Sequence, residues 1–214
     1  MPRIVETQVY EFHELSDEAK EKARAWFREG VGDHDWHEFI FDDFEQVCRI
    51  LGVALKTYPV RLMGGGTRQK PRIYFTGFCS QGDGACFAAA YEYANGSARR
   101  IRDYAPQDAE LHRIADVLQD AQRRNFYQLR ADTTHRGRYC DAHSMGITVE
   151  RNSPHYQDMT ADAADAVIES LRDLANWLYR QLEREWEYMM SDEYADEGIA
   201  ANAYTFTQSG RRFG

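Results

Sequence analysis

The sequence predicts an α+β protein, and three observations lead to this class. Predicted strands and helices do not alternate one by one along the chain, as they would in a parallel doubly wound sheet. Two pairs of strand-like segments are each joined by a short turn. A long C-terminal segment has apolar residues at helical spacing. We therefore expect a largely antiparallel sheet with two β-hairpins, covered by an N-terminal helical hairpin and a long C-terminal helix.

The N-terminal part is predicted to contain one strand and two helices. Arg3 to Phe12 alternates apolar and polar residues, which is typical of a strand. Ser16 is a good N-cap for a helix from about Asp17 to Gly30. A second helix is expected from near Asp35 to Gly52, a residue that can end it. Its apolar residues recur at helical spacing: Trp36, Ile40, Phe44, Val47 and Leu51.

The clearest β-hairpin is predicted in the middle of the chain. A strand from Val53 to Leu62 and a glycine-containing loop from Met63 to Lys70 precede it. The hairpin itself joins Arg72 to Cys79 with Ala85 to Tyr93 through the turn 80–84, which Asp83 shapes by bonding its own backbone. Because both strands are apolar on both faces, we expect this hairpin at the centre of a covered sheet.

A helix, a second hairpin and a long helix follow. The first helix should span Pro106 to Arg123, and the hairpin should join Phe126 to Ala131 with Arg138 to Arg151. From Thr160, the expected N-cap, a helix runs towards Met190. A last strand is expected at Ala203 to Thr207. The apolar stripe of the long helix consists of Val167, Leu171, Leu174, Leu178 and Leu182.

Composition indicates one α+β domain over residues 1–214, located in a cytoplasm. The chain has 43% hydrophobic residues, enough for a substantial core. No apolar run approaches the roughly 18 residues that span a bilayer, so we expect no membrane association. Four cysteines are too few for a disulfide scaffold, and reduced thiols are expected. The net charge is −8 over residues 1–48, +6 over 49–157 and −7 over 158–214.

One candidate catalytic set combines an acid, a base and a thiol. Asp141 and His143 share a face of the predicted second hairpin and could act as an orienting carboxylate and a general base. Cys79 or Cys86 on a neighbouring strand would then be the nucleophile. The alternative, a buried structural hydrogen-bonded pair, is favoured because a sequence cannot show that a nucleophile is within reach. We therefore assign no catalytic residue and leave enzymatic activity open, with a non-enzyme as the stronger expectation.

The cysteines and His143 could also form a zinc site, but the predicted strand geometry argues against it. Cys79 and Cys86 flank the turn of the first hairpin, and Cys140 with His143 would complete a Cys3His set. On a regular strand, Cys140 and His143 would point to opposite faces because an odd number of positions separates them. The sequence thus predicts no metal and no cofactor, and it predicts that Cys79 and Cys86 are buried, reduced thiols.

The basic central segment raises the alternative of nucleic-acid binding. Aromatic residues Tyr104, Phe126 and Tyr127 lie among its arginines, a pattern that single-strand binding uses. The chain as a whole is acidic and has no helix-turn-helix or zinc-finger pattern, so direct binding of nucleic acid is the weaker alternative. The arginines concerned are Arg99, Arg100, Arg102, Arg123, Arg124, Arg130, Arg136 and Arg138.

The C-terminal end carries a run of acids that could form a partner-binding surface. Carboxylates along a helix could imitate nucleic-acid phosphates and occupy a basic channel on a partner, although a solvated helix face is the simpler alternative. We expect these side chains to face outward as an acidic ridge. They are Glu183, Glu185, Glu187, Asp192, Glu193, Asp196 and Glu197.

Three segments spread over most of the chain carry a family resemblance. They are Val9 to Arg24, Ile73 to Phe87 and Ala203 to Phe213, and the most specific piece is Gly-Phe-x-Ser-Gln-Gly-Asp-Gly at 77–84. In these segments the chain resembles small proteins of phages and prophages of Gram-negative bacteria, loosely labelled antitoxins of toxin-antitoxin stability systems. The resemblance implies a mobile-element origin, in which small non-enzymatic proteins often bind and block host machinery.

We therefore expect a non-catalytic phage or prophage inhibitor. Its partner would be a bacterial host protein or complex, basic or itself nucleic-acid-binding, and an anti-defence role against a CRISPR complex is one form of this hypothesis. Three alternatives stay open: an antitoxin that neutralises a cognate toxin, a small Cys/His-dependent hydrolase or transferase, and a nucleic-acid-binding protein. The charge distribution also leaves a homo-oligomer open.

Overall fold

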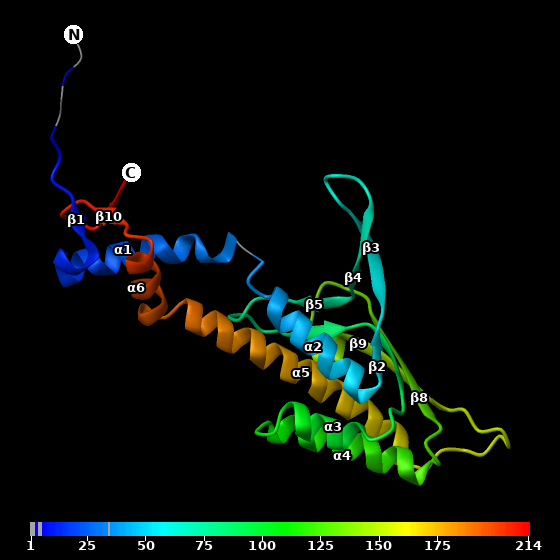
Figure 1. The fold of residues 1–214 in the computed structure, drawn as a ribbon. Coiled ribbons are helices and arrows are strands. Elements are labelled where there is room, and N and C mark those ends of the chain that lie inside the picture. The colour runs from blue at the N-terminus through cyan, green and yellow to red at the C-terminus, as the bar shows by residue number, and fades with distance from the viewer. Residues whose placement is uncertain (1–2, 4–5, 34) are drawn as a thin grey trace. The chain divides into compact units, whose positions relative to one another are not determined.

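The computed structural model describes residues 3, 6–33 and 35–214 (Figure 1). Its contacts divide the chain into two compact units, one of residues 1–37 and 183–214 and one of residues 38–182. Two compact units can belong to one domain or to two, so a single domain over residues 1–214 stays a prediction. The predicted fold class is confirmed, because six helices accompany antiparallel sheets in the described residues.

A four-stranded antiparallel sheet is the centre of the second unit. Its strands are β2 (Val53–Leu55), β7 (Ala89–Glu92), β8 (Leu129–His135) and β9 (Met145–Arg151), in the order β2-β7-β8-β9. Tyr91 of β7 pairs with Ala131 of β8, which in turn pairs with Val149 of β9. Leu129, Ala131 and Thr133 are buried while the residues between them are exposed, so one face of the sheet is covered and the other is open.

The covered face of the sheet shares its core with helices α2 (Glu38–Leu51), α4 (Ala109–Arg124) and α5 (Ala163–Met189). The ring of Phe44 on α2 lies 5.4 Å from Phe87 and 6.4 Å from Trp177 of α5. Gln122 of α4 donates to the carbonyl oxygen of Leu129 and accepts the amide hydrogen of the same residue. The predicted apolar stripe of the long helix is confirmed, since all five of its members are fully buried: Val167, Leu171, Leu174, Leu178 and Leu182.

The first predicted hairpin is present but is covered only in part. Strand β5 (Ile73–Phe75) pairs with β6 (Ala85–Phe87), and β6 is buried throughout. In β7, however, Ala90 and Glu92 are exposed, so the prediction of burial on both faces is wrong there. The strand is interrupted at Ala88, and beyond it the chain joins the sheet whose outer face is open. Small alanine side chains made both faces look apolar although only one is covered.

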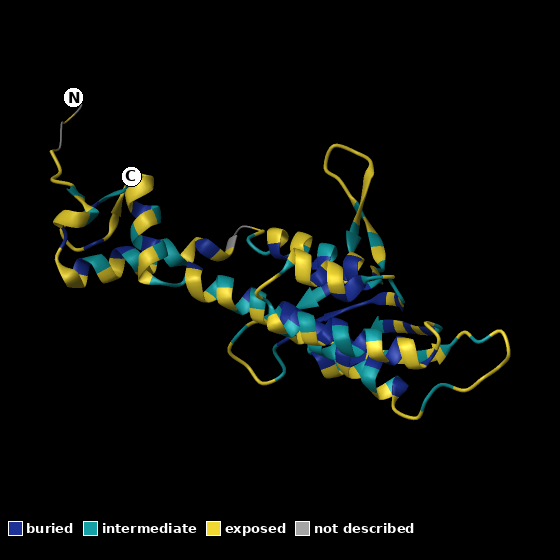
Figure 2. Ribbon diagram, turned by 60° about the horizontal axis from the view of Figure 1, so that its bottom comes forward, coloured by how far each residue is buried: buried dark blue, intermediate teal, exposed yellow. Residues whose placement is uncertain are grey.

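Three further elements of the second unit differ from the predictions. The predicted strand 53–62 is divided into β2 and β3 (Thr57–Arg61), and the predicted loop 63–70 contains most of β4 (Thr67–Pro71), which pairs with β3. Figure 2 shows that this hairpin is largely exposed. Helix α3 (Ser97–Tyr104) had no prediction. Thr160 is not an N-cap, because its amide and hydroxyl groups are hydrogen-bonded to Asn125 and α5 begins three residues later.

The first unit packs two helices and a small sheet around its own core. Helix α1 (Asp17–Glu29) is capped by Ser16, as predicted, and α6 (Asp192–Ala201) by Ser191. Of the predicted first strand, Arg3 to Phe12, only β1 (Tyr10–Glu11) is present among the described residues. Residues 4–5 of the predicted strand lie outside the described residues. Strands β10 (Thr205–Phe206) and β11 (Arg212–Phe213) complete an antiparallel sheet in the order β1-β10-β11. The buried core consists of Leu15, Ala19, Ala23, Ile199 and Phe206.

Short 3-10 turns connect several of these elements. They are η1 (Phe12–Glu14), η2 (Val31–Asp33) and η3 (Ala142–Ser144). The second strand of the second hairpin was predicted to begin at Arg138, but β9 begins only at Met145, directly after η3. The prediction is therefore wrong for residues 138–144. None of the helices among the described residues is long and apolar enough to cross a membrane.

Candidate functional site

Two thiols and an imidazole meet in the second unit. Cys86 lies on β6, His135 is the last residue of β8, and Cys140 lies in the loop before η3. Their sulfur and ring nitrogen atoms all lie within 4.8 Å of one another. The Sγ atom of Cys140 is 4.0 Å from Nε2 of His135. We name Cys86, His135 and Cys140 the thiol-imidazole cluster.

A close backbone approach brings Cys140 to Cys86. A Cβ atom added to Gly84, two residues before Cys86, would lie 2.8 Å from Cα of Asp141 and 2.9 Å from the carbonyl oxygen of Cys140. Only glycine lets the turn lie this close to the loop. The turn is shaped as predicted by Asp83, whose carboxylate accepts the amide hydrogens of Cys79 and Ser80 at 2.9 and 2.6 Å.

Asp141 and Ser144 order the loop beside the cluster. One carboxylate oxygen of Asp141 accepts the amide hydrogens of His143 and Ser144, which caps η3. The hydroxyl group of Ser144 donates to the carbonyl oxygen of Asp141 at 2.6 Å. The same Oγ atom lies 3.4 Å from Nδ1 of His135.

Burial favours the protonated form of both thiols of the cluster. Burial raises the pKa of Cys86 to about 12, and it also raises the pKa of Cys140. A nucleophilic cysteine has the opposite property, a lowered pKa that supplies thiolate. By itself, the cluster is therefore a poor centre for nucleophilic catalysis.

The four residues of the candidate catalytic set do not form an acid–base–nucleophile arrangement, although the carboxylate of Asp141 lies close enough to Cys86 to contribute to the raised pKa of that thiol. Cys79 is exposed, so the prediction that it is buried is wrong. Cys79 belongs to the turn, where the carboxylate of Asp83 accepts its backbone amide hydrogen. His143 is exposed, and its ring has no hydrogen-bond partner in the part of the chain that the structure describes. Asp141 caps η3 and does not orient an imidazole.

His135 is the residue that sequence reasoning missed. The prediction placed it in a turn and applied strand alternation to Cys140 and His143. Residues 136–141 are a loop, where alternation of faces does not hold, and this loop turns back to the end of β8. The signal available in the sequence was the spacing of His135 and Cys140, five residues apart, together with a further cysteine, Cys86, in the neighbouring predicted hairpin.

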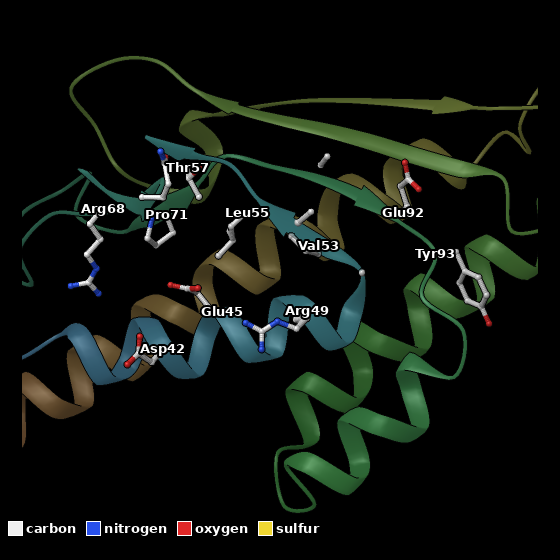
Figure 3. Close-up of a pocket in the computed structure, with 14 residues that line it drawn as sticks. Asp42, Glu45, Arg49, Val53, Leu55, Thr57, Arg68, Pro71, Glu92 and Tyr93 are labelled. Carbon is white, nitrogen blue, oxygen red and sulfur yellow. The ribbon is translucent and has the colours of Figure 1, made fainter. Parts of the chain in front are cut away.

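A second concave site lies between α2, β2 and the β3–β4 hairpin (Figure 3). It has a volume of about 720 Å³. Asp42, Glu45 and Arg49 project from α2, and Arg68 projects from the opposite hairpin. Since both signs of charge line the cleft, its electrostatics select no single class of ligand.

Ion pairs neutralise most of the predicted basic stripe. Arg100 donates to the carbonyl oxygen of Ile50. Among the described residues, only Arg136 and Arg138 of the eight arginines lack a polar side-chain contact. This arrangement weakens the nucleic-acid alternative, because neutralised arginines attract phosphates less. The pairs are Arg99–Asp103, Arg102–Asp116, Arg123–Asp120, Arg124–Asp162 and Arg130–Glu92.

The seven predicted partner-binding acids lie on two helices, and only some of them form ion pairs. Ser191 begins α6, so three acids lie at the end of α5 and four on α6. Asp192 and Asp196 form ion pairs with Arg24 of α1, and Asp192 also with Arg28, so they are not free. The other five have no ion pair within the described ranges: Glu183, Glu185, Glu187, Glu193 and Glu197.

An exposed tyrosine stands among these unpaired acids. Tyr188 is 45% exposed, and its ring lies 5.3 Å from that of Tyr194. The charges of Glu197, Glu193 and Glu185 raise the pKa of Tyr188, with Glu197 making the largest contribution. The same negative potential would favour a cation near the ring. The acidic surface, as we use the term below, consists of Glu185, Glu187, Tyr188, Glu193 and Glu197.

Comparison with known proteins gives one match. Residues 36–192 match a family model described as a domain of unknown function (DUF8835). No curated protein and no solved structure matches the chain. The matched range contains the thiol-imidazole cluster and the part of the acidic surface on α5, whereas Glu193 and Glu197 lie beyond it.

Proposed function

Because the chain belongs to the DUF8835 family, whose description assigns no activity, we propose its function from its own residues: it is a non-catalytic inhibitor that binds a basic surface of a bacterial protein or complex. The acidic surface is the proposed contact. The proposed target is a phage-defence complex such as a CRISPR complex, and a cognate toxin is the alternative target. The resemblance to phage and prophage proteins supports this choice of target.

The observation that carries the proposal is a group of uncompensated carboxylates around an exposed aromatic ring. Exposed carboxylates without a paired cation keep their full field in solution, and this field steers basic partners within about 8 Å at physiological salt. Tyr188 adds apolar area and a hydroxyl group, and tyrosine is enriched at the energetic centres of interfaces. Charge and an aromatic anchor together favour a protein partner over a small ion.

The non-catalytic form of the proposal is supported by the second unit. Burial raises the pKa of Cys86 and of Cys140, and Cys79 and His143 are exposed. His135 lies 4.0 Å from Sγ of Cys140, but the raised pKa of this thiol disfavours the thiolate that a nucleophile needs, which weighs against the hydrolase and transferase alternative.

The test compares two charge-reversed triple variants. Glu185→Lys, Glu187→Lys and Glu197→Lys change the acidic surface, and all three positions lie towards helix C-termini, where lysine suits the helix dipole. The matched control reverses exposed acids elsewhere. Both variants should unfold within about 0.5 kcal/mol of the parent, since charges that are exposed, or partly exposed as at Glu185, contribute little to stability. The control substitutions are Glu6→Lys, Glu29→Lys and Asp158→Lys.

Affinity capture from a lysate of a Gram-negative host identifies the partner, and its dissociation constant is then measured for each variant. The reversal at the acidic surface should weaken binding about tenfold or more, because each lost charge contributes about 0.5 kcal/mol. Binding of the parent should also weaken as salt is raised. Equal binding by parent and reversed variant would remove the acidic surface as the contact. A parent that captures no protein would overturn the inhibitor proposal.

A further inference from the structure

We propose that Cys86, His135 and Cys140 bind a zinc ion, with the fourth coordination position open to water or a small exogenous ligand. This inference uses no residue of the acidic surface. Two thiolates and one imidazole form a soft to borderline donor set, which favours zinc over calcium or magnesium. Three protein ligands with one open position are also a recurrent arrangement of zinc in proteins.

The ligand atoms are close to the separations that zinc requires. With Zn–S near 2.3 Å and Zn–N near 2.1 Å, tetrahedral geometry places S and N about 3.6 Å apart and two sulfur atoms about 3.8 Å apart. The distance of 4.0 Å between Sγ of Cys140 and Nε2 of His135 exceeds the first value by only about 0.4 Å. All three atoms lie within 4.8 Å of one another, so small side-chain rotations suffice.

The hydrogen bonds around His135 select the tautomer that binds metal. The single hydroxyl hydrogen of Ser144 goes to the carbonyl oxygen of Asp141, which can only accept. The Oγ atom of Ser144 can therefore accept a hydrogen bond from Nδ1 of His135, 3.4 Å away, and this contact favours the tautomer with its proton on Nδ1. The lone pair is then on Nε2, the atom that faces Cys140. Metal-binding histidines are oriented by the same kind of second partner.

The backbone holds the three ligands in place before any metal arrives. Cys86 and His135 belong to strands, and Cys140 is held by the contact of its loop with Gly84 and by the cap that Asp141 provides. The ring of Tyr74 lies 5.1 Å from that of His135 and limits its movement. Each cysteine would lose its proton to solvent on binding, so that Zn²⁺ and two thiols give a neutral zinc dithiolate and two released protons.

The experiment uses the full chain stripped of metal by a chelator under reducing conditions. Cobalt(II) is titrated as a spectroscopic probe, and zinc is then added to displace it. The parent should bind one cobalt per chain and show thiolate-to-cobalt charge transfer with the strong visible bands of a tetrahedral site. Zinc should abolish both signals with the same stoichiometry.

Matched pairs of variants locate the site. Cys140→Ser and His135→Gln should lose the tetrahedral signal, whereas Cys79→Ser and His143→Gln should keep it. Ser144→Ala leaves all three ligands in place and should weaken cobalt binding about tenfold, as loss of a second partner does at metal sites. No Cys86 variant is used, because Cys86 is buried and its substitution would disturb the fold. Circular dichroism of every variant checks that it is folded.

Two results would overturn the zinc site. One is a parent protein that gives no tetrahedral cobalt spectrum. The zinc site is also overturned if such a parent forms a disulfide bond between Cys86 and Cys140 on oxidation, because the two cysteines are then a dithiol pair only. The other is a spectrum that folded Cys140→Ser and His135→Gln retain. Neither outcome bears on the acidic surface, whose partner binding is measured separately.

Discussion

The guanidinium group of Arg24 on α1 donates two hydrogen bonds to the carboxylate of Asp196 on α6, at 2.6 and 2.7 Å. Only 16% of the Arg24 side chain is exposed, and the hydrogen bond that it donates to Asp196 is the main reason that the pKa of Arg24 lies above its usual range. This two-point contact joins helices that are distant in sequence, within the first unit. It also removes Asp196 from the predicted partner-binding acids.

Replacing Asp196 by alanine should therefore destabilise the protein. The half-buried guanidinium would lose a bidentate partner, which we expect to lower the free energy of unfolding by about 2 kcal/mol. Urea unfolding followed by circular dichroism measures it. The control is Glu18→Gln in the exposed pair with Lys22, which should cost at most about 0.5 kcal/mol. Equal losses in both variants would show that the Arg24–Asp196 contact is no stronger than a surface ion pair.

Thr133 should be needed for its hydroxyl group rather than for its volume. The buried Oγ1 atom accepts the amide hydrogen of Ala89 at 2.7 Å, at the interruption between β6 and β7. Thr133→Val keeps the shape but leaves this amide without an acceptor, at a cost of about 1–3 kcal/mol in unfolding free energy. Thr148→Val, on the exposed face of β9, is the control and should change little. If both variants unfold at the same urea concentration, the hydroxyl group of Thr133 is dispensable.

Gly210 should tolerate no side chain. It has φ of +82°, and a Cβ atom there would lie 2.0 Å from the carbonyl oxygen of Ala19 on α1. Gly210→Ala should destabilise by at least about 2 kcal/mol, through left-handed strain and displacement of the C-terminal turn. Gly64→Ala, where nothing lies within 4 Å, should be neutral or slightly stabilising. Thermal unfolding of the two variants compares them, and a stable Gly210→Ala protein would contradict this packing.

Alkaline pH should destabilise the fold through Tyr91. Burial raises the pKa of Tyr91 to about 12, against about 10 in the unfolded chain. Because the folded pKa is the higher one, the stabilisation is complete below pH 10 and is lost as pH rises towards 12. Its size is about 2–3 kcal/mol, from about 1.4 kcal/mol per pKa unit.

Unfolding free energies measured between pH 9 and 12 test this dependence. Tyr91→Phe should flatten the alkaline loss without abolishing it, since Cys86 titrates in the same range. Tyr156→Phe, at a position 97% exposed, should leave the slope unchanged. A slope that Tyr91→Phe does not alter would assign the alkaline loss to other groups.

Local patterns in the sequence determined the fold class and most helices. Ser16 predicts the start of α1, because an N-cap depends only on its own side chain and on the first turn of the helix. The apolar stripe from Val167 to Leu182 predicts the buried face of α5. These signals depend on neighbours within one helix. For the same reason, the alanines of β7 gave a false two-sided pattern, since the cover of a strand comes from other elements.

Tertiary structure alone decided the candidate sites. His135 meets Cys86 and Cys140 because the loop after β8 turns back against Gly84, a contact between segments that no periodicity connects. Asp192 and Asp196 lose their free charge because α6 packs on α1, where Arg24 and Arg28 lie. A sequence gives the sign of each charge and the type of each ligand atom. Only the packed chain brings a partner within reach, because that distance is set by contacts between elements far apart in sequence.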